Sequence, residues 1–443
     1  MAEQMKSSGI DWIKDIPSSW EINKVKYLAT EPGTLFLDGD WIESDVIEES
    51  GIRYLTTGNV GAGFYKEQGS GYISEKTFSE LHCLNVYPGD LMISRLNEPI
   101  GRSCIIPDTE SRYVVAVDNV VLRPNANYNK KFIMYGMNAD GYAEHANMIA
   151  RGATMSRISR SQLGQFWLAF PNIEEQQAIA DFLDKECAQI DSIAADLEKQ
   201  IALLQQYKKS LITETVTKGL DKSEPMKDSG VEFFGKMPAH WKVSKTKYVA
   251  DISIGLVTTM TANYVDEDGV PLIRNSNIRT NHIDDNGMVY LSKEFAKANI
   301  GRALHKGDIV TVHTGDVGTS AIINETYHMS HGFATIISRL KTKTVNNQFL
   351  CWLYNSEIFK EMSIAYSTGD GRQNLNLYDF VDFYILIPTL KEQMEIVNWL
   401  NLKCTEIDNF IENKQQQLLL IQQHKKSLIY EYVTGKKRVK EVQ

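Results

Sequence analysis

The stretch IEEQQAIADFLDKECAQIDSIAADLEKQIALLQQYKKSLITETVT, residues 173–217, decides the fold of this 443-residue chain. A second stretch, residues 390–434, follows at a constant offset of 217 without a gap and reads LKEQMEIVNWLNLKCTEIDNFIENKQQQLLLIQQHKKSLIYEYVT. Both contain Glu-Gln near the start, Ile-Asp in the first half and Lys-Lys-Ser-Leu-Ile near the end. Repetition of this extent indicates one architecture built twice.

Each stretch predicts one long helix. In the first, four apolar residues fall seven apart: Ile190, Leu197, Leu204 and Leu211. Further apolar residues at intermediate three- and four-residue spacing complete a stripe on one helix face. Neither stretch contains Gly or Pro before Gly219 and Gly435, where a helix could end. Such a helix would span on the order of 65 Å and needs a partner for its stripe, so we expect the repeats to form an antiparallel intramolecular coiled coil.

The composition is that of an ordinary soluble protein, with 43% hydrophobic and 23% charged residues. No apolar run approaches the roughly 18 residues of a membrane span, and residues 1–17 lack the apolar block of a signal peptide. Five cysteines without a CxxC pair favour a reducing, cytoplasmic location and no metal site. The net charge of −9 argues mildly against a free-standing nucleic-acid binder, although a basic partner could supply phosphate contacts.

The repeat extends beyond the helices. An opening motif, P-x-x-W followed by K-x-K-Y, occurs at residues 17–27 and again at 238–248, with Trp20 and Trp241 as expected domain anchors. Short β-branched and aromatic runs divided by Gly, Pro and Asp follow each motif, so both bodies are predicted to be rich in strands. The predicted class is α+β with a pseudo-two-fold internal repeat. The predicted divisions are a first domain at 1–172, a helix at 173–219, a linker and second domain at 220–389, and a helix with a basic tail at 390–443.

A search for catalytic motifs finds little. The chain has no HExxH, no GxSxG and no sequential cluster of metal ligands. Lys76-Thr77 lacks the glycine of a phosphate-binding loop, and His328-x-x-His331 is more simply a plain loop in a strand-rich region. An enzyme is therefore the weakest interpretation.

Features suited to nucleic acid are more numerous. Residues 145–173 and 326–356 contain no Asp or Glu and carry several Arg and Lys, which predicts local positive potential. Loops rich in Asn and Arg occur at matched places in both halves, and these side chains can pair bidentately with guanine and adenine. The matched loops are 56–59 with 274–277, 94–97 with 312–315, and 151–157 with 368–374. The alternative is that each is a solvated loop.

Taken together, these features of the chain resemble one family, the DNA-specificity subunits of Type I restriction-modification systems. The residues that carry the resemblance are the two P-x-x-W motifs, the P-x-x-x-E-Q segments at 171–176 and 388–393, the two Ile-Asp pairs and the two Lys-Lys-Ser-Leu-Ile helix ends. Each motif is weak alone. In this order, twice, they cover essentially the whole chain.

The resemblance implies two target-recognition domains separated by a two-helix spacer, each domain reading one half of a bipartite DNA site. It implies a subunit that catalyses nothing and binds double-stranded DNA, two methyltransferase (modification) subunits and translocase-nuclease (restriction) subunits. S-adenosylmethionine, ATP and Mg would be bound by those partners, which would methylate adenine N6. Two alternatives remain: a specificity subunit for a fused methyltransferase-nuclease, and a coiled-coil adaptor joining two β domains with no DNA role.

Individual base contacts follow from the matched loops only as hypotheses. In the first domain the candidate DNA-binding residues are Thr57, Asn59, Arg95, Asn97, Arg151 and Arg157. In the second they are Arg274, Asn277, Arg279, His313, Arg372, Gln373 and Asn374. The divergence of the two bodies predicts an asymmetric target.

Overall fold

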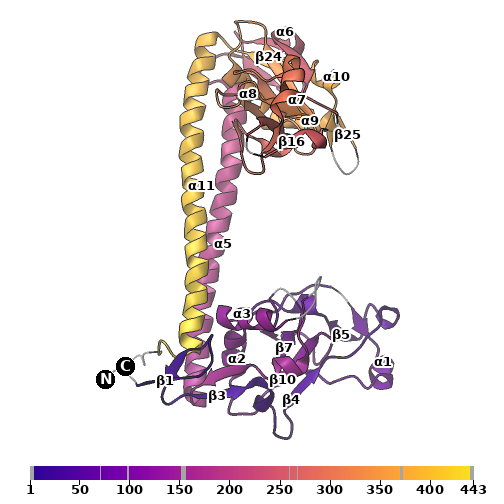
Figure 1. Ribbon diagram of the computed structural model, residues 1–443, viewed down its shortest axis with the longest axis vertical. Helices are drawn as coiled ribbons and strands as arrows, with labels where there is room; N and C mark the ends of the chain where they lie inside the picture. The colour runs from indigo at the N-terminus through magenta and orange to yellow at the C-terminus, as the bar shows by residue number, and fades with distance from the viewer. Residues whose placement is uncertain are drawn as a thin grey trace. The chain divides into compact units, whose positions relative to one another are not determined.

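A computed structural model of the chain describes residues 4–69, 71–96, 99–150, 156–258, 260–266, 268–369 and 373–439 (Figure 1). It divides into two compact units. Unit 1 comprises Met1–Leu197 with Gln416–Gln443, and unit 2 comprises Glu198–Gln415. Among the described residues, no helix combines the length and the apolar character needed to cross a membrane.

Unit 1 is built on small sheets and short helices. Its strands are β1 (Met5–Ser7), β2 (Asp15–Pro17), β3 (Glu21–Lys24), β4 (Leu35–Asp38), β5 (Ile52–Leu55), β6 (Tyr72–Ile73), β7 (Leu91–Ser94), β8 (Ser103–Ile105), β9 (Tyr113–Val115), β10 (Asn119–Arg123) and β11 (Trp167–Phe170). Its helices before the long one are η1 (Val25–Leu28), η2 (Ser44–Val46), η3 (Thr57–Asn59), α1 (Glu75–Glu80), α2 (Lys130–Met137), α3 (Asp140–Ile149) and α4 (Arg160–Leu163). An antiparallel sheet has the order β4-β10-β7-β8, a second sheet has the order β6-β5-β9, and β3 pairs with β11.

Unit 2 repeats this plan with additions. Its strands are β12 (Met226–Asp228), β13 (Lys236–Pro238), β14 (Lys242–Lys245), β15 (Ala250–Ile254), β16 (Tyr264–Val265), β17 (Val270–Arg274), β18 (Ile278–Arg279), β19 (His282–Ile283), β20 (Val289–Leu291), β21 (Ile309–Val312), β22 (Ser320–Ile322), β23 (His331–Phe333), β24 (Thr335–Leu340), β25 (Ser367–Thr368), β26 (Asn374–Leu375) and β27 (Tyr384–Ile387). Its short helices are α6 (Thr246–Val249), η4 (Thr261–Asn263), η5 (Asn275–Asn277), α7 (Lys293–Ala298), η6 (Ile300–Arg302), α8 (Asn347–Tyr354), α9 (Glu357–Ala365) and α10 (Leu377–Phe380). The sheet β15-β24-β21-β22 and the pair β14-β27 repeat the first unit's arrangement.

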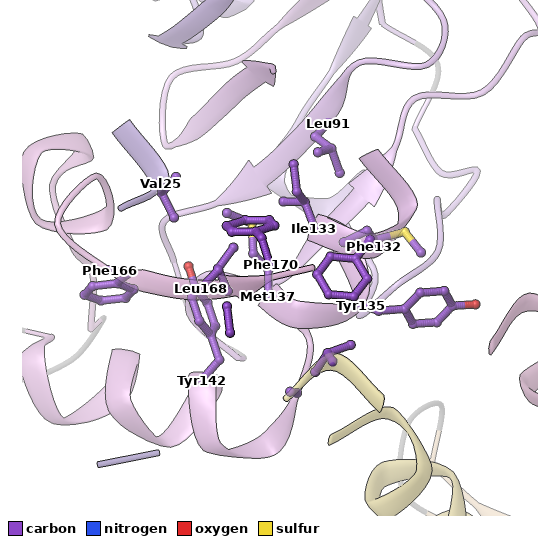
Figure 2. Packing of buried hydrophobic residues seen from close by; sticks show 14 of the residues in the cluster. Val25, Leu91, Phe132, Ile133, Tyr135, Met137, Tyr142, Phe166, Leu168 and Phe170 are labelled. Carbon is purple, nitrogen blue, oxygen red and sulfur yellow. The ribbon is translucent and has the colours of Figure 1, made fainter. Parts of the chain in front are cut away.

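The core of unit 1 lies where α2 and α3 cover the strands that lead into the long helix. Phe132 and Phe170 have ring centroids 5.9 Å apart, and Tyr142 meets Phe166 edge to face at 5.4 Å. Figure 2 shows the rings of Phe132, Phe166 and Phe170 among aliphatic side chains of the same cluster. Burying one such side chain contributes about 1.5–3 kcal/mol, so this cluster fixes the body against its strands.

The two long helices begin where the repeat predicts. α5 spans Ile173–Lys218 and α11 spans Leu390–Val433. The side chain of Asn172 accepts from the backbone NH of Glu175 at 2.9 Å and so caps the first turn of α5. Gly219 follows the end of α5 with a φ of +75°, a backbone conformation that suits glycine.

The helices pair antiparallel, which confirms the predicted coiled coil. In unit 1, Phe182 of α5 contacts Tyr432 of α11, while Asp191 further along α5 pairs with Lys425 earlier on α11. In unit 2, Lys208 of α5 pairs with Asp408 of α11. The predicted stripe is buried or half-buried, including Ile190 and Leu197 in unit 1 and Leu204 and Leu211 in unit 2.

The repeated Glu-Gln pair fastens each body to its long helix. The Gln176 side chain accepts from the NH of Asn129 at 2.9 Å and donates to the carbonyl of Pro171 at 2.9 Å. Gln393 does the same with Asn346 at 2.7 Å and Pro388 at 2.9 Å. Both side chains are buried, which explains why an amide recurs at this place.

The opening motifs pack on the far ends of the helices. Trp20 and Trp241 are buried, as predicted for domain anchors. Within unit 1, Gly435 after α11 lies against Pro17 and Trp20, and a Cβ at residue 435 would collide with the proline ring. Lys436 donates to the carbonyl of Ile13 at 2.7 Å. In unit 2, Lys218 makes the matching bond to Phe234 at 3.2 Å, so each helix end holds one opening motif in place.

Candidate nucleic-acid interface

The described parts of the matched loops of the first half lie together in unit 1. Arg102 joins them, because its guanidinium donates to the carbonyl of Thr57 at 3.0 Å and to that of Leu96 at 2.8 Å. Leu96 in turn forms an isolated β-bridge with Arg157. Segments 56–59, 95–96 and 156–157 therefore converge on one side of the unit. We call this set, with its counterpart in unit 2, the loop edge.

Unit 2 assembles the matching segments. Asn275 donates to the carbonyl of Thr314 at 3.3 Å, and the Thr314 hydroxyl donates to the side chain of Asn374 at 3.2 Å. The NH of Gly315 donates to the carbonyl of Gln373 at 3.0 Å. Segments 274–277, 313–315 and 373–374 thus form the second loop edge.

The two loop edges stand on one common frame. Asp90 accepts from Arg123 Nε at 2.9 Å in unit 1, and Asp308 accepts from Arg339 Nε at 2.9 Å in unit 2. Asn138 accepts from the NH of Ser103 at 3.2 Å, and its counterpart Asn355 accepts from Ser320 at 3.0 Å. These bonds fix which positions of the two units correspond.

Asn59 and Asn277 serve the frame. The Asn59 carbonyl oxygen accepts from the NH of Thr56 at 2.8 Å, and its amide donates to the carbonyls of Lys66 and Gln68 at 3.0 and 2.9 Å. Asn277 accepts from Arg274 at 3.1 Å and donates to two carbonyls of its own loop. Both side chains are buried and fully bonded. Their recurrence is explained by this loop-closing role, and neither is presented to a base.

Arginines of unit 1 are held by two aspartates. Arg95, with only 12% of its side chain exposed, lies 3.3 Å from Asp38 and 3.2 Å from Asp118. Arg157 is 65% exposed and its nearest carboxylate, Asp118, is 3.9 Å away. Arg160 pairs with Asp38 at 3.1 Å. Of the two predicted arginines that the structure describes in this unit, Arg157 is therefore more accessible than Arg95.

Unit 2 presents mostly uncharged polar groups. His313 Nδ1 lies 2.6 Å from the Thr314 hydroxyl, and Asn374 is exposed. Arg279 is 48% exposed and pairs with Asp284 at 3.1 Å. Arg274 is half-buried and donates to the carbonyl of Gly287. Three predicted contacts, Asn97, Arg151 and Arg372, lie outside the described residues.

The positive potential predicted for residues 326–356 is reduced in the folded structure by ion pairs. Arg339 is paired with the buried Asp308, and Lys341 lies 3.1 Å from Asp251. Asp251 lies in β15 and Asp308 directly precedes β21, and both strands pair with β24, which contains Arg339. The prediction for residues 326–356 is therefore corrected: these ion pairs neutralise charges that appear isolated along the chain.

Two lysines in each opening motif were not among the predicted site residues. Lys24 and Lys26 of unit 1 lie over the rings of Trp167 and Tyr27, both at 4.8 Å. In unit 2, Lys245 and Lys247 lie over Tyr384 and Tyr248. The signal was present in the sequence, because K-x-K-Y occurs in both opening motifs. No group of three His, Cys, Asp or Glu side chains is placed to hold a metal ion in the described ranges.

Comparison with known proteins points to one family. A profile described as the Type I restriction modification DNA specificity domain matches residues 20–203 and 238–423. The chain is 25% identical over 281 residues to the Type I restriction enzyme EcoBI specificity subunit of Escherichia coli, covering 61% of this chain and 58% of that protein. It is 26% identical over 378 residues to the putative type I restriction enzyme MjaX specificity subunit of Methanocaldococcus jannaschii, covering 84% and 83%.

Solved structures share the fold. A chain from work on complex assembly and conformational transition of the type I R-M system superposes with a TM-score of 0.72 at 12% identity, covering 95% of this chain and 99% of that one. The HsdS subunit from Thermoanaerobacter tengcongensis gives a TM-score of 0.53 at 12% identity, covering 95% and 98%. At such low identity the likeness establishes the fold alone.

Proposed function

Since the chain belongs to the Type I restriction-modification DNA specificity family, we propose that it reads a bipartite, asymmetric double-stranded DNA target for partner subunits. Unit 1 would read one half of the target and unit 2 the other. The chain would direct adenine-N6 methylation and restriction without catalysing either. S-adenosylmethionine, ATP and Mg would be bound by the partners that carry out the chemistry.

One observation carries the proposal: the same frame positions bear different side chains at the two loop edges. Unit 1 carries five ionic side chains at or beside its loop edge, namely Asp38, Arg95, Asp118, Arg157 and Arg160. The corresponding residues of unit 2 are Ile254, His313, Ala334, Asn374 and Leu377. Their correspondence rests on equal strand register, Asp38 facing Val120 and Ile254 facing Ile336, and on the left-handed backbone of both Asp118 and Ala334. A frame with exchanged contact residues suits two different half-sites.

Accessible members of the loop edges are the proposed base contacts. Arg157 can reach out of unit 1 because most of its side chain is exposed. In unit 2 the candidates are His313, Gln373 and Asn374 of the loop edge, with the exposed Arg279 just beyond it in sequence. Arg and Asn are suited to bidentate contacts with guanine and adenine, so the two units would prefer different bases. Thr57, Arg95 and Arg274 are bonded within the frame and would act by holding these groups.

Modification subunits would dock on the long helices. Apolar side chains on them stay exposed after the two helices have paired: Ile193, Leu419 and Leu420 in unit 1, and Leu203, Leu402 and Phe410 in unit 2. Leu203, Leu419 and Leu420 are each more than half exposed, which is unusual on a finished helix pair and suits a protein interface. Two modification subunits, together with translocase-nuclease subunits, are the partners proposed here.

Methylation mapping tests the proposal. A host carrying this chain and the methyltransferase gene beside it is compared, by long-read sequencing, with a host lacking only this chain. We expect a bipartite motif containing N6-methyladenine that disappears when the chain is absent. An unchanged methylation pattern, with the chain folded and its neighbour expressed, would contradict the proposal.

A further inference from the structure

The paired lysines of the two opening motifs sit on the same backbone frame. In unit 1, the NH of Lys26 donates to the carbonyl of Gly164 at 3.1 Å. In unit 2, the NH of Lys247 donates to the carbonyl of Val381 at 3.0 Å. Residues 160–165, RSQLGQ, therefore correspond in space to residues 377–382, LYDFVD.

On this frame the lysines of unit 1 keep their charge unpaired. Lys24 donates to the neutral side chain of Gln165 at 2.8 Å, and neither Lys24 nor Lys26 has an ion-pair partner in the part of the chain that the structure describes. Arg160 lies in the adjoining turn, because the NH of Gly164 donates to the carbonyl of Arg160 at 2.8 Å, and a Cβ at residue 164 would lie 3.1 Å from the Lys26 Cβ. We call Lys24, Lys26 and Arg160 the basic face.

The corresponding face of unit 2 is neutralised. Asp382, at the position of Gln165, lies 2.9 Å from Lys245 and 2.6 Å from Lys247. Hydrogen bonds from Lys247 and Lys245 lower the pKa of Asp382. A second acid, Asp379, stands where unit 1 has Gln162. Asp382 thus pairs with both lysines of unit 2, whereas in the basic face Asp38 pairs with Arg160 and no carboxylate of the described residues pairs with Lys24 or Lys26.

We propose that the basic face of unit 1 binds phosphate groups of the DNA backbone, and that Asp382 withholds the same contact in unit 2. The inference rests on the proposed DNA-reading function and adds where the backbone is anchored. A lysine ammonium held over an aromatic ring keeps its charge and has donors left for a phosphate oxygen.

The position of the basic face favours DNA over a protein partner. Arg157 of the loop edge is three residues from Arg160, so the two surfaces adjoin, and phosphates flank any base that is read. Two copies of one partner protein would require the same charge on both faces. A DNA backbone has no such requirement, and the faces differ in charge.

Salt dependence of DNA binding tests the inference. The full chain, assembled with its methyltransferase, is titrated against a duplex bearing the mapped methylation motif at several salt concentrations. Affinity falls as the salt concentration rises, and each lost phosphate contact makes the plot of log affinity against log salt less steep by about 0.9. We expect the slope to become less steep by about 1 in Gln165→Asp and by about 2 in the double variant Lys24→Gln with Lys26→Gln. Both variants should bind all sequences more weakly to the same extent.

The reciprocal variant and a matched control sharpen the test. Asp382→Gln should make the salt dependence steeper and the affinity higher, because it frees Lys245 and Lys247. Lys76→Gln removes an equally positive charge from α1, where Lys76 is exposed and pairs with Glu80, and should leave the slope unchanged. Gln165→Asp is expected to fold, since unit 2 carries Asp at this position, and thermal unfolding verifies this.

Two results would overturn the inference while leaving the proposed function intact. One is motif-specific binding with the same salt slope in the wild type and in Gln165→Asp. The other is an unchanged slope accompanied by loss of the co-purifying methyltransferase, which would make the basic face a protein-docking surface. A wild-type complex that binds no motif at all would contradict the proposed function as well.

Discussion

The carboxylate of Asp191 on α5 accepts a hydrogen bond of 2.6 Å from the ammonium of Lys425 on α11. In unit 2 the roles are exchanged, and Lys208 of α5 donates to Asp408 of α11 at 2.6 Å. The repeated Ile-Asp motif therefore supplies the acid, and the repeated Lys-Lys-Ser-Leu-Ile motif the base, of an ion pair that occurs twice between the helices. Each copy provides the acid of one pair and the base of the other, which selects the antiparallel pairing of the helices.

Reversing one charge of the Asp191–Lys425 ion pair should lower the free energy of unfolding slightly, and reversing both charges should restore it. Asp191→Lys is expected to lower the free energy of unfolding by about 1 kcal/mol, because exposed ion pairs contribute about 0–1 kcal/mol and the variant adds repulsion. Adding Lys425→Asp should recover most of the loss. Denaturant unfolding of the full chain measures both, with the exposed Asp196→Asn as control. Failure of the double variant to recover would contradict a pairing role.

Asn59→Ala should act through stability. It leaves the NH of Thr56 and the carbonyls of Lys66 and Gln68 without their partner, at a cost of about 1–3 kcal/mol in the free energy of unfolding. Asn277→Ala should behave alike in unit 2. Chemical unfolding measures the loss, and methylation mapping of the remaining folded protein should give an unchanged motif. A changed base in the motif would instead make Asn59 a reading residue.

Arg157→Ala should act through recognition. Its side chain is mostly exposed, so the free energy of unfolding should change by no more than about 0.5 kcal/mol. Loss of a base contact should weaken binding by about 1–3 kcal/mol and relax one position in one half of the motif. Asn374→Ala, at the corresponding place in unit 2, should relax a position in the other half. If both variants relaxed positions in the same half of the motif, the assignment of one half to each unit would be contradicted.

Acid should loosen unit 2 through Glu392. Burial acts to raise its pKa, but hydrogen bonds from Thr389, His240 and Trp241 prevail and lower the pKa to about 2. A depressed carboxyl pKa stabilises the fold above its unfolded value near 4.5, and the contribution is lost as the pH falls from there toward 2. Glu392→Gln should flatten the dependence of unfolding on pH in that window. Glu395→Gln, whose carboxylate is exposed on the same helix, is the matched control and should not flatten it.

The architecture could be predicted from the sequence because its signals are local and repeated. Helix periodicity and the twofold Lys-Lys-Ser-Leu-Ile motif need no knowledge of distant contacts, and α5 begins at Ile173 as predicted. The described parts of the matched loops also lie together, through Arg102 in unit 1 and Thr314 in unit 2, which their recurrence in the sequence did not predict.

Individual side-chain roles could not be predicted, because they depend on distant parts of the chain. Asn59 looks like a base reader in sequence, yet its amide closes its own loop and is buried. Arg339 looks free, but Asp308 of the adjoining strand neutralises it. The difference between Gln165 and Asp382 became meaningful only when both were found beside the lysines of the opening motifs.

The most direct test of the central claim, that each unit reads its own half of the target, is an exchange of one body. Residues 20–170 are replaced by the matching body of a family member with a different mapped motif, and methylation is mapped again in the same host. We predict that one half of the motif changes to that of the donor, while the other half stays as it was. A change in both halves, or in neither with the chimera folded and assembled, would contradict the claim.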